Sequence, residues 1–245
     1  MRSFGSNQYF KEIYIRDTDD KWLLKCRVSQ KLRIKLIKDA ISRYSHLSPC
    51  IDIGTGDGYL LKTIAPNFFN NFDVVELDKN ACSILSNYGF NNVICAEFPN
   101  LKISKKYNLF TCFDSLYYLN DQYRNIALKK VYNSLEINGI FIVSISYYEK
   151  YFKQNEFKER LLSLNLDNHF KIIFEIRKSF YVFHIAEKII SYLNRKLGFT
   201  EQNSIYRNIL LYSGSFLYYS GLASILNFIF KLKETNGLLI FKKIK

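Results

Sequence analysis

The sequence predicts an α/β fold: a doubly wound, mostly parallel, Rossmann-like sheet of seven strands with a helical insertion between the last two. Three observations lead to this prediction. Short apolar runs alternate five times with helical patterns between residues 49 and 145. A glycine-dense turn follows the first apolar run, and acidic residues lie at the end of each of the next three apolar runs. Because ligands of such sheets bind beyond the carboxyl ends of the strands, the pattern also predicts a binding site there.

The first strand and its turn are the most informative stretch. A buried strand, residues 51–53, is followed by the turn GTGDG (residues 54–58) and by a helix, residues 59–65. Glycines allow a ligand to approach the backbone, and free N–H groups at a helix start favour polar or anionic groups. A dinucleotide-binding turn has its third glycine where this chain has Tyr59. Glycine at every second position is typical instead of S-adenosylmethionine (SAM) sites; a glycine turn in an unrelated α/β protein is the alternative.

The next two strands also end in acids. The second strand, residues 72–78, places a carboxylate where ribose hydroxyls are bound, and we favour Glu76 over Asp78 for this role. The third strand ends before Glu97 and Phe98. An acid followed by an aromatic residue can receive an adenine amino group and cover its ring, whereas packing in the core is an equal alternative for Phe98.

The fourth strand, residues 107–113, ends before the sequence DSLYY at residues 114–118. A helix, residues 121–135, and an apolar fifth strand, residues 140–145, complete the alternation. All these strand ends meet at one edge of a parallel sheet. This convergence is stronger evidence for a site than any single motif.

The chain divides into four expected parts: an N-terminal aromatic segment with a leader helix (1–48), the α/β core (49–178), a helical insertion (179–236) and the last strand (237–245). The aromatic segment, residues 7–25, either folds over the mouth of the site or packs on the core. The insertion contains apolar helical patterns at 181–197 and 205–232. We expect it to act as a lid that sets acceptor specificity.

Residues 9–145 resemble the class I SAM-dependent methyltransferases and, among them, the nodulation protein S group, whose relatives methylate sugar amines. The matching pieces are YFKEIY, IDIGTGDGYLLKTIAP, VVELDKNA, AEFP, FDSLYYL and LEINGIFIVSI. The resemblance implies that SAM is bound by Asp52, Gly54, Thr55, Gly56, Gly58, Glu76, Leu77, Glu97, Phe98 and Phe113. It places Asp114, Tyr117 and Tyr118 beside the acceptor as the catalytic group.

The implied reaction is in-line transfer of a methyl group to an amine or hydroxyl of a small or glycan-type acceptor, lipid-linked acceptors included. The sulfonium is already activated, so the protein mainly aligns the reactants and excludes water. Asp114 is the expected group that orients the acceptor and takes its proton, with Tyr117 and Tyr118 as hydrogen-bonding walls. We expect His169 and His184 to be structural.

The charge of the chain leaves other functions open. The net charge is +13, of which the last 95 residues carry +8, and this fits nucleic acid, an anionic membrane, an acidic substrate or a solvated lysine-rich surface. Enzymes that methylate exocyclic base amines carry an Asn/Asp-Pro-Pro-aromatic loop after the fourth strand; FDSLYY contains no proline, which disfavours nucleic acid. An RNA or other nucleic-acid methyltransferase and an inactive SAM-binding protein are the alternatives.

Cysteine and histidine usage points to the cytoplasm and away from metals. The five cysteines contain no CxxC pair, which predicts reduced, mostly buried thiols in a cytosolic protein. The three histidines lie far apart in the sequence, so no metal site is expected. The N-terminal residues lack a continuous apolar core of the kind found in secretory signals.

The stretch 205–232 raises the question of a membrane. Ile209 to Phe230 contains 22 residues without a charge, which is long enough to cross a hydrocarbon core of ~30 Å. However, its tyrosines and serines make it wetter than a usual span, and Gly214 and Gly221 allow a bend. A spanning helix would also separate the last strand from its sheet. We expect a lid or an interfacial helix in peripheral contact with the inner membrane face; a plain buried helix pair is the equal alternative.

Overall fold

The computed structural model describes residues 12, 14, 24–146, 170–178, 181–199, 204–229 and 236–244. The rest of the aromatic segment 7–25, residue His169 and the end of the 205–232 stretch lie outside the described residues. The chain forms two compact units, which we describe separately. The sheet unit comprises residues 1–15, 37–176 and 237–245, and the helical unit comprises residues 16–36 and 177–236.

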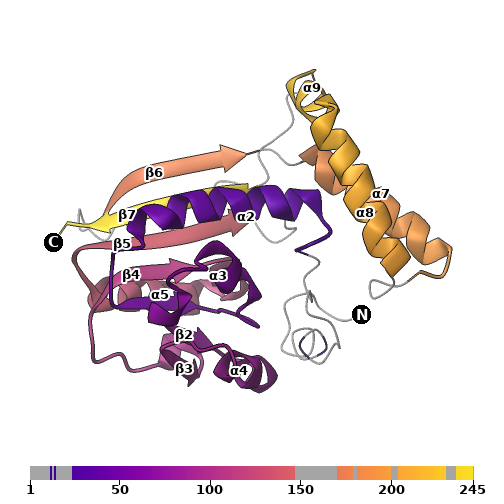
Figure 1. Cartoon of the computed structure of the whole chain (residues 1–245). Helices are drawn as coiled ribbons and strands as arrows, with labels where there is room; N and C mark the ends of the chain where they lie inside the picture. The colour runs from indigo at the N-terminus through magenta and orange to yellow at the C-terminus, as the bar shows by residue number, and fades with distance from the viewer. Residues whose placement is uncertain are drawn as a thin grey trace. The chain divides into compact units, whose positions relative to one another are not determined.

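The sheet unit is built on one sheet of seven strands in the order β3-β2-β1-β4-β5-β7-β6 (Figure 1). The strands are β1 (Cys50–Ile53), β2 (Phe72–Glu76), β3 (Asn92–Cys95), β4 (Tyr107–Cys112), β5 (Leu135–Ser146), β6 (Phe170–Lys178) and β7 (Asn236–Lys243). β1 to β5 pair in parallel, and β7 runs opposite to its neighbours. The predicted doubly wound, mostly parallel sheet is confirmed.

The helices begin and end for local reasons that the sequence contains. They are α2 (Val28–Ile41), α3 (Tyr59–Ile64), α4 (Lys79–Ser86), α5 (Asp121–Ser134), α7 (Tyr181–Lys196), α8 (Ser204–Tyr219) and α9 (Leu222–Ile229). Asp78 caps α4 by accepting hydrogen bonds from the N–H groups of Asn80 and Ala81. Asn120 caps α5 through the N–H of Tyr123. The chain runs outward from β1 to β3 and then returns to β4, so right-handed crossovers place helices on both faces of the sheet.

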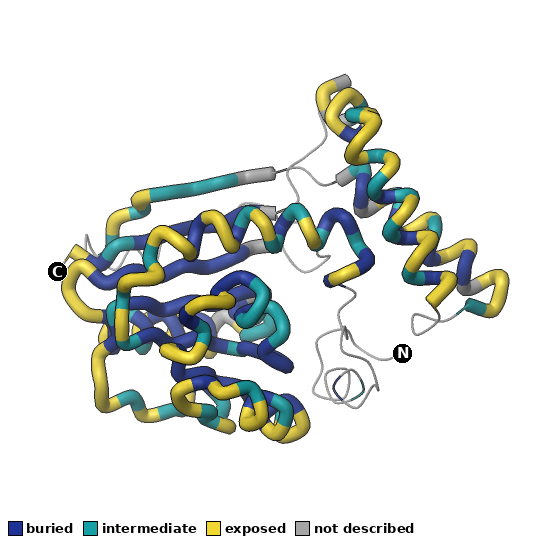
Figure 2. Tube along the Cα trace, viewed as in Figure 1, coloured by how far each residue is buried: buried dark blue, intermediate teal, exposed yellow. Residues whose placement is uncertain are grey.

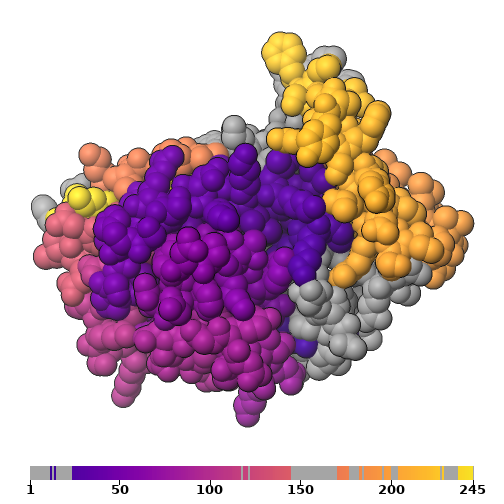
Figure 3. Space-filling view, viewed as in Figure 1, coloured from indigo at the N-terminus to yellow at the C-terminus, as the bar shows by residue number. Residues whose placement is uncertain are grey.

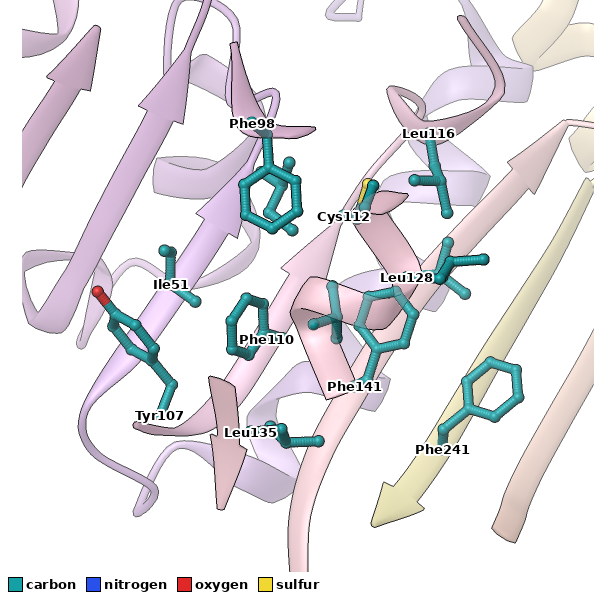
Figure 4. Close-up of a cluster of buried hydrophobic side chains, with 14 of the residues drawn as sticks. Ile51, Phe98, Tyr107, Phe110, Cys112, Leu116, Leu128, Leu135, Phe141 and Phe241 are labelled. Carbon is teal, nitrogen blue, oxygen red and sulfur yellow. The ribbon is translucent and has the colours of Figure 1, made fainter. Parts of the chain in front are cut away.

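The core of the sheet unit lies between the central strands and α5 (Figure 4). Phe110 on β4 and Phe141 on β5 are buried there, and the ring of Phe141 stacks on Phe241 of β7 with centroids 5.9 Å apart. Each such side chain contributes about 1.5–3 kcal/mol when fully buried. This apolar layer fixes the strands whose carboxyl ends carry the candidate site.

Two segments differ from the sequence-based expectation. β5 begins at Leu135 rather than at residue 140, because the Asn138-Gly139 turn is a bulge inside a continuous strand: Asn138 has φ of 66° and the register against β4 shifts there. The expected helix 205–232 is divided at Gly221, whose φ is 71°. Among the described residues, no helix combines the length and the apolar character that a membrane span requires.

The expectation of reduced thiols is wrong for one pair of cysteines. Cys82 on α4 and Cys95 at the end of β3 form a disulfide, with Cα atoms 5.9 Å apart. They are 13 residues apart in the sequence, and only the packing of α4 beside β3 brings them together. Cys26, Cys50 and Cys112 are buried free thiols, as predicted. The disulfide removes part of the argument for a reducing compartment.

Candidate active site at the carboxyl ends of β1, β2 and β4

The glycine turn after β1 depends on backbone conformations that other residues rarely adopt. Gly54, Gly56 and Gly58 have φ values of 69°, 64° and 78°. A Cβ on Gly54 would overlap the side chain of Ser115, so the loop after β4 lies directly against this turn. A Cβ on Gly56 would lie 3.0 Å from the hydroxyl oxygen of Tyr14. The turn is therefore a backbone surface that two other segments approach closely.

Glu76 joins the glycine turn to the tip of β2. Its Oε2 accepts the Gly56 N–H at 2.8 Å, and its Oε1 accepts the N–H groups of Leu77 at 2.9 Å and Asp78 at 3.0 Å. Burial raises the pKa of Glu76, while these backbone N–H groups oppose the rise. A carboxylate oxygen can accept two hydrogen bonds, so Oε2 retains a lone pair for a ligand hydroxyl. Asp78, the second choice for ribose, is used as the cap of α4.

Asp52 and Thr55 stabilise the glycine turn through buried hydrogen bonds. The Asp52 carboxyl is buried and accepts a hydrogen bond from the Thr111 hydroxyl at 2.5 Å. Burial raises its pKa to about 7. The Thr55 hydroxyl donates to the backbone oxygen of Asp52 at 3.3 Å. Both side chains thus stabilise the turn within the sheet unit, at positions that the sequence assigned to SAM binding.

Asp114 is held by two hydrogen bonds to one side chain. The Ser144 hydroxyl donates to Asp114 Oδ1 at 2.8 Å and accepts the Asp114 N–H at 3.0 Å. Asp114 has φ of 55°, a conformation that aspartate tolerates better than most residues. The neighbouring Ser115 hydroxyl donates to the Ile53 carbonyl at 2.7 Å, which fixes this loop to β1. The half-buried Asp114 carboxylate is therefore positioned at the point where the strand order reverses, between β1 and β4.

The remaining residues assigned to SAM, of which Glu97 and Phe98 were assigned to adenine, lie in different environments. Leu77 is an apolar side chain that is 51% exposed beside Glu76. Glu97 is half-buried and accepts a hydrogen bond from Asn100 Nδ2. Phe98 and Phe113 are buried, and Phe98 belongs to the main core cluster (Figure 4). For Phe98 the structure corresponds to the core-packing alternative, which leaves Leu77 as the exposed apolar surface.

Tyr117 and Tyr118 were predicted to lie beside the acceptor. The side chain of Tyr117 lies outside the described part of the structure, whereas that of Tyr118 is described. Tyr118 is half-buried, and its N–H donates to the Ser115 carbonyl at 3.1 Å. Because Ser115 lies against Gly54, Tyr118 belongs to the same end of the sheet as the glycine turn.

Sequence reasoning missed two residues of this site. Tyr14 is buried over the glycine turn, and burial, followed by the nearby charges of Glu76 and Asp57, raises its pKa, so the phenol stays protonated. The YFKEIY motif was the available signal for a covering segment. Arg124 on α5 is buried, and its Nη2 donates to the Leu119 carbonyl at 2.7 Å, which holds the loop after β4. A single arginine in a helical pattern gives no comparable signal.

The site fits an adenosyl-type ligand on three counts. It offers a turn whose three glycines have positive φ, one remaining acceptor position on Glu76 and an exposed apolar residue, Leu77, beside it. These are the groups that a ribose with an attached aromatic base requires. Asp114 lies after the neighbouring strand β4, beyond the residues assigned to the adenosyl part.

Solved structures share this architecture over most of the chain. The N-methyltransferase NodS from Bradyrhizobium japonicum, in complex with S-adenosyl-L-homocysteine, aligns with a TM-score of 0.62 and 12% identity, covering 97% of this chain and 98% of that chain. This is the class I methyltransferase fold. A putative sarcosine dimethylglycine methyltransferase from Galdieria sulphuraria aligns with a TM-score of 0.57 and 13% identity, covering 88% and 87% of the two chains.

A third structure with this fold is the magnesium protoporphyrin IX methyltransferase ChlM from Synechocystis with bound SAM, at a TM-score of 0.54 and 16% identity over 72% of this chain and 86% of that chain. No protein-family model matches the sequence, and no match was found among the curated proteins. The resemblance to the NodS-like methyltransferase fold, predicted from the motifs, is confirmed at the level of the fold.

Proposed function

We propose that this protein is a SAM-dependent methyltransferase that methylates an amine or a hydroxyl of a small or glycan-type acceptor. The observation that supports it most is the hydrogen bond of 2.8 Å between Glu76 Oε2 and the Gly56 N–H. It joins the glycine turn after β1 to the acid after β2, which are the two elements that a nucleoside-binding site of this fold requires. The amine part of the proposal also draws on NodS, a neighbour named as an N-methyltransferase.

The cofactor is assigned to the turn and the two strand tips beside it. When bound, SAM supplies a methyl group on a positively charged sulfur. Gly54, Gly56 and Gly58 let the ligand lie against the backbone, and Glu76 accepts a ribose hydroxyl through the free position on Oε2. Leu77 packs against the base, and Glu97 receives its amino group.

Asp114 is assigned to the acceptor. Its carboxylate, held by Ser144, accepts a hydrogen bond from the attacking amine or hydroxyl, orients it and takes its proton as the new bond to carbon forms. Tyr118 and Tyr117 are assigned to the wall around the acceptor. The helical insertion, residues 179–236, is assigned to acceptor selection.

Two other functions remain candidates and are separated from this proposal by experiment. A nucleic-acid methyltransferase would methylate RNA rather than amino sugars, and an inactive SAM-binding protein would bind SAM without transferring its methyl group. Localisation in the cytoplasm stays a prediction from the cysteine usage, and the Cys82–Cys95 disulfide argues against it.

Calorimetry with SAM and S-adenosylhomocysteine tests the cofactor site. We expect a dissociation constant in the micromolar range, about −7 to −9 kcal/mol, and at least a tenfold loss of affinity for Glu76→Ala. Unchanged affinity in this variant would show that the pocket is wrongly assigned. A panel of amino sugars, nucleotide sugars, glycolipids, small amines and RNA, with methyl transfer as readout, then identifies the acceptor class.

A further inference from the structure

The helical unit carries an apolar surface that its own packing leaves uncovered. The inner side of α8 is buried: Tyr206 donates a hydrogen bond of 2.8 Å to Ser191 on α7, and Gly214 lies against Val28. The outer side is also apolar. The residues along it, alternately four and three positions apart, are Ile205, Ile209, Tyr212, Phe216 and Tyr219. This spacing places them in one stripe along the helix, which we call the α8 stripe.

The α8 stripe is open to solvent. Tyr212, Phe216 and Tyr219 are 71%, 68% and 84% exposed, and on α9 the side chains of Ile225 and Phe228 are 53% and 85% exposed. Figure 2 shows exposed positions recurring along these helices, and Figure 3 shows their side chains, in gold, on the surface of this unit. A surface helix normally carries polar residues on its outer side. An exposed apolar surface of this kind marks an interaction site.

The charge around this surface is one-sided. By sequence, the helical unit contains 15 basic and 6 acidic residues, against 20 and 16 in the sheet unit. Glu187 is the one acid among the described residues of the helical unit, and it is buried, accepting hydrogen bonds from Ser29 Oγ at 2.8 Å and 2.9 Å. The exposed Lys188 and Lys196 on α7 are basic. The described part of this unit therefore presents positive charge alone to a partner.

We propose that the α8 stripe and the outer side of α9 dock on the surface of an anionic membrane. Tyrosine and phenylalanine favour the boundary between headgroups and acyl chains, because the ring is apolar while the tyrosine hydroxyl remains hydrated. Lysine and arginine near the surface are attracted to anionic headgroups. α8 has 16 residues and a bend follows at Gly221, so the helix lies in the interface plane, where an apolar face enters the membrane without crossing it.

A second copy of the chain fits the same surface less well. Pairing two α8 stripes would bring together two units that each have a net charge of +9 by sequence, and these charges repel. An anionic membrane would attract the same charges. The apolar stripe alone fits either a membrane or a second copy of the chain, and the positive charge favours the membrane.

Flotation of the full chain with lipid vesicles tests the proposal. We expect the protein to float with vesicles of phosphatidylcholine and phosphatidylglycerol and to stay at the bottom with phosphatidylcholine alone. The double variant Phe216→Gln/Phe228→Gln should bind the mixed vesicles at least tenfold less well. The matched control Ile137→Gln, which changes a residue of β5 that is 64% exposed, should bind as the wild type does.

A second readout does not depend on loss of binding. In the variant Trp22→Phe/Phe216→Trp, which has its single tryptophan at position 216, the fluorescence should shift to the blue with mixed vesicles and stay unchanged with phosphatidylcholine. Absence of flotation, equal binding to both vesicle types, or full binding by the double variant would each overturn the proposal. So would a wild-type dimer in solution that the double variant converts to a monomer, because the stripe would then belong to a second copy. SAM affinity, measured on the same variants, should not change, which separates this test from that of the methyltransferase assignment.

Discussion

The two units of this protein present different groups at their surfaces. In the sheet unit, carboxylates bind backbone N–H groups: Glu76 fixes the glycine turn and Asp78 caps α4. In the helical unit, the acid Glu187 is buried and accepts hydrogen bonds from Ser29, and most exposed side chains of α8 are apolar. The sheet unit thus presents a small set of directed groups suited to one ligand, whereas the helical unit presents an undirected surface suited to an extended partner. Specific chemistry and surface attachment are divided between them.

The largest effect should come from the Asp114 carboxylate. We expect Asp114→Asn to lower turnover about a thousandfold, because a positioned general base contributes roughly 10²–10⁴-fold. Asparagine tolerates the positive φ of this position, so the loop should keep its shape. Turnover is measured with the acceptor that the panel identifies, and SAM affinity by calorimetry should stay within a few-fold. A collapse of SAM binding would place Asp114 with the cofactor and remove its assignment to the acceptor.

The second largest effect is a change in the free energy of unfolding with pH, caused by Asp52. The pKa of Asp52 is raised to about 7 by burial, compared with ~3.9 in the unfolded chain. The folded state therefore keeps a proton that the unfolded chain loses, and the associated stability, fully present below the unfolded pKa, is lost as the pH rises through the folded pKa. Between pH 5 and pH 8 the wild type should lose about 3 kcal/mol more of its unfolding free energy than Asp52→Asn. Urea unfolding curves that run parallel for both proteins would contradict this.

Two glycines of the sheet unit allow the effect of backbone strain to be distinguished from the loss of a contact with SAM, because only Gly56 is assigned to the SAM site. Gly56 and Gly89 both have positive φ, 64° and 77°, but a Cβ at Gly56 would meet the Tyr14 hydroxyl, whereas one at Gly89 would meet nothing within 4 Å. Gly56→Val should weaken SAM binding at least tenfold, about 1.4 kcal/mol or more. Gly89→Val carries the same kind of strain and should leave the affinity unchanged. Equal affinities of the two variants in calorimetry would show that the turn does not contact the ligand.

The smallest effect is expected from a glycine of the helical unit. A Cβ on Gly214 would lie 2.8 Å from Val28 Cγ2, so Gly214→Ala overpacks the contact between α8 and α2. Alanine also favours the helix by roughly 1 kcal/mol, which offsets part of the overpacking, and a net loss of about 1 kcal/mol should remain. Thermal unfolding measures the loss, and SAM affinity is the control. If Gly214→Ala changed SAM affinity as Gly56→Val does, the division of roles between the units would fail.

The parts of the site that follow from local backbone chemistry were predictable. The glycine turn, the choice of Glu76 over Asp78 as the acid directed at it, and the strands on either side depend on residues close in sequence or on alternating patterns. Such features need little knowledge of the packed chain. The lysine-rich charge and the uncharged run in 205–232 were equally visible, because they are properties of composition.

What could not be predicted depends on contacts between distant residues. The disulfide between Cys82 and Cys95 requires α4 to lie beside β3, and the burial of Phe98 depends on how the turn after β3 meets α5. The two glycines of the 205–232 stretch looked equivalent in the sequence. In the structure Gly221 ends α8, while Gly214 continues it because its missing side chain makes room for Val28.

The place of β7 has a consequence for the order in which the protein is made. β7 is later in the sequence than every helix and strand described here, yet it lies between β5 and β6, with Leu238, Leu239 and Ile240 fully buried. While a ribosome is still synthesising the helical insertion, the edge of β5 has no strand beside it on this side, and β6 has none to pair with. An unpaired apolar edge is prone to join another chain. The nascent protein therefore passes through a stage in which its sheet is open, and the eight residues of β7 close it.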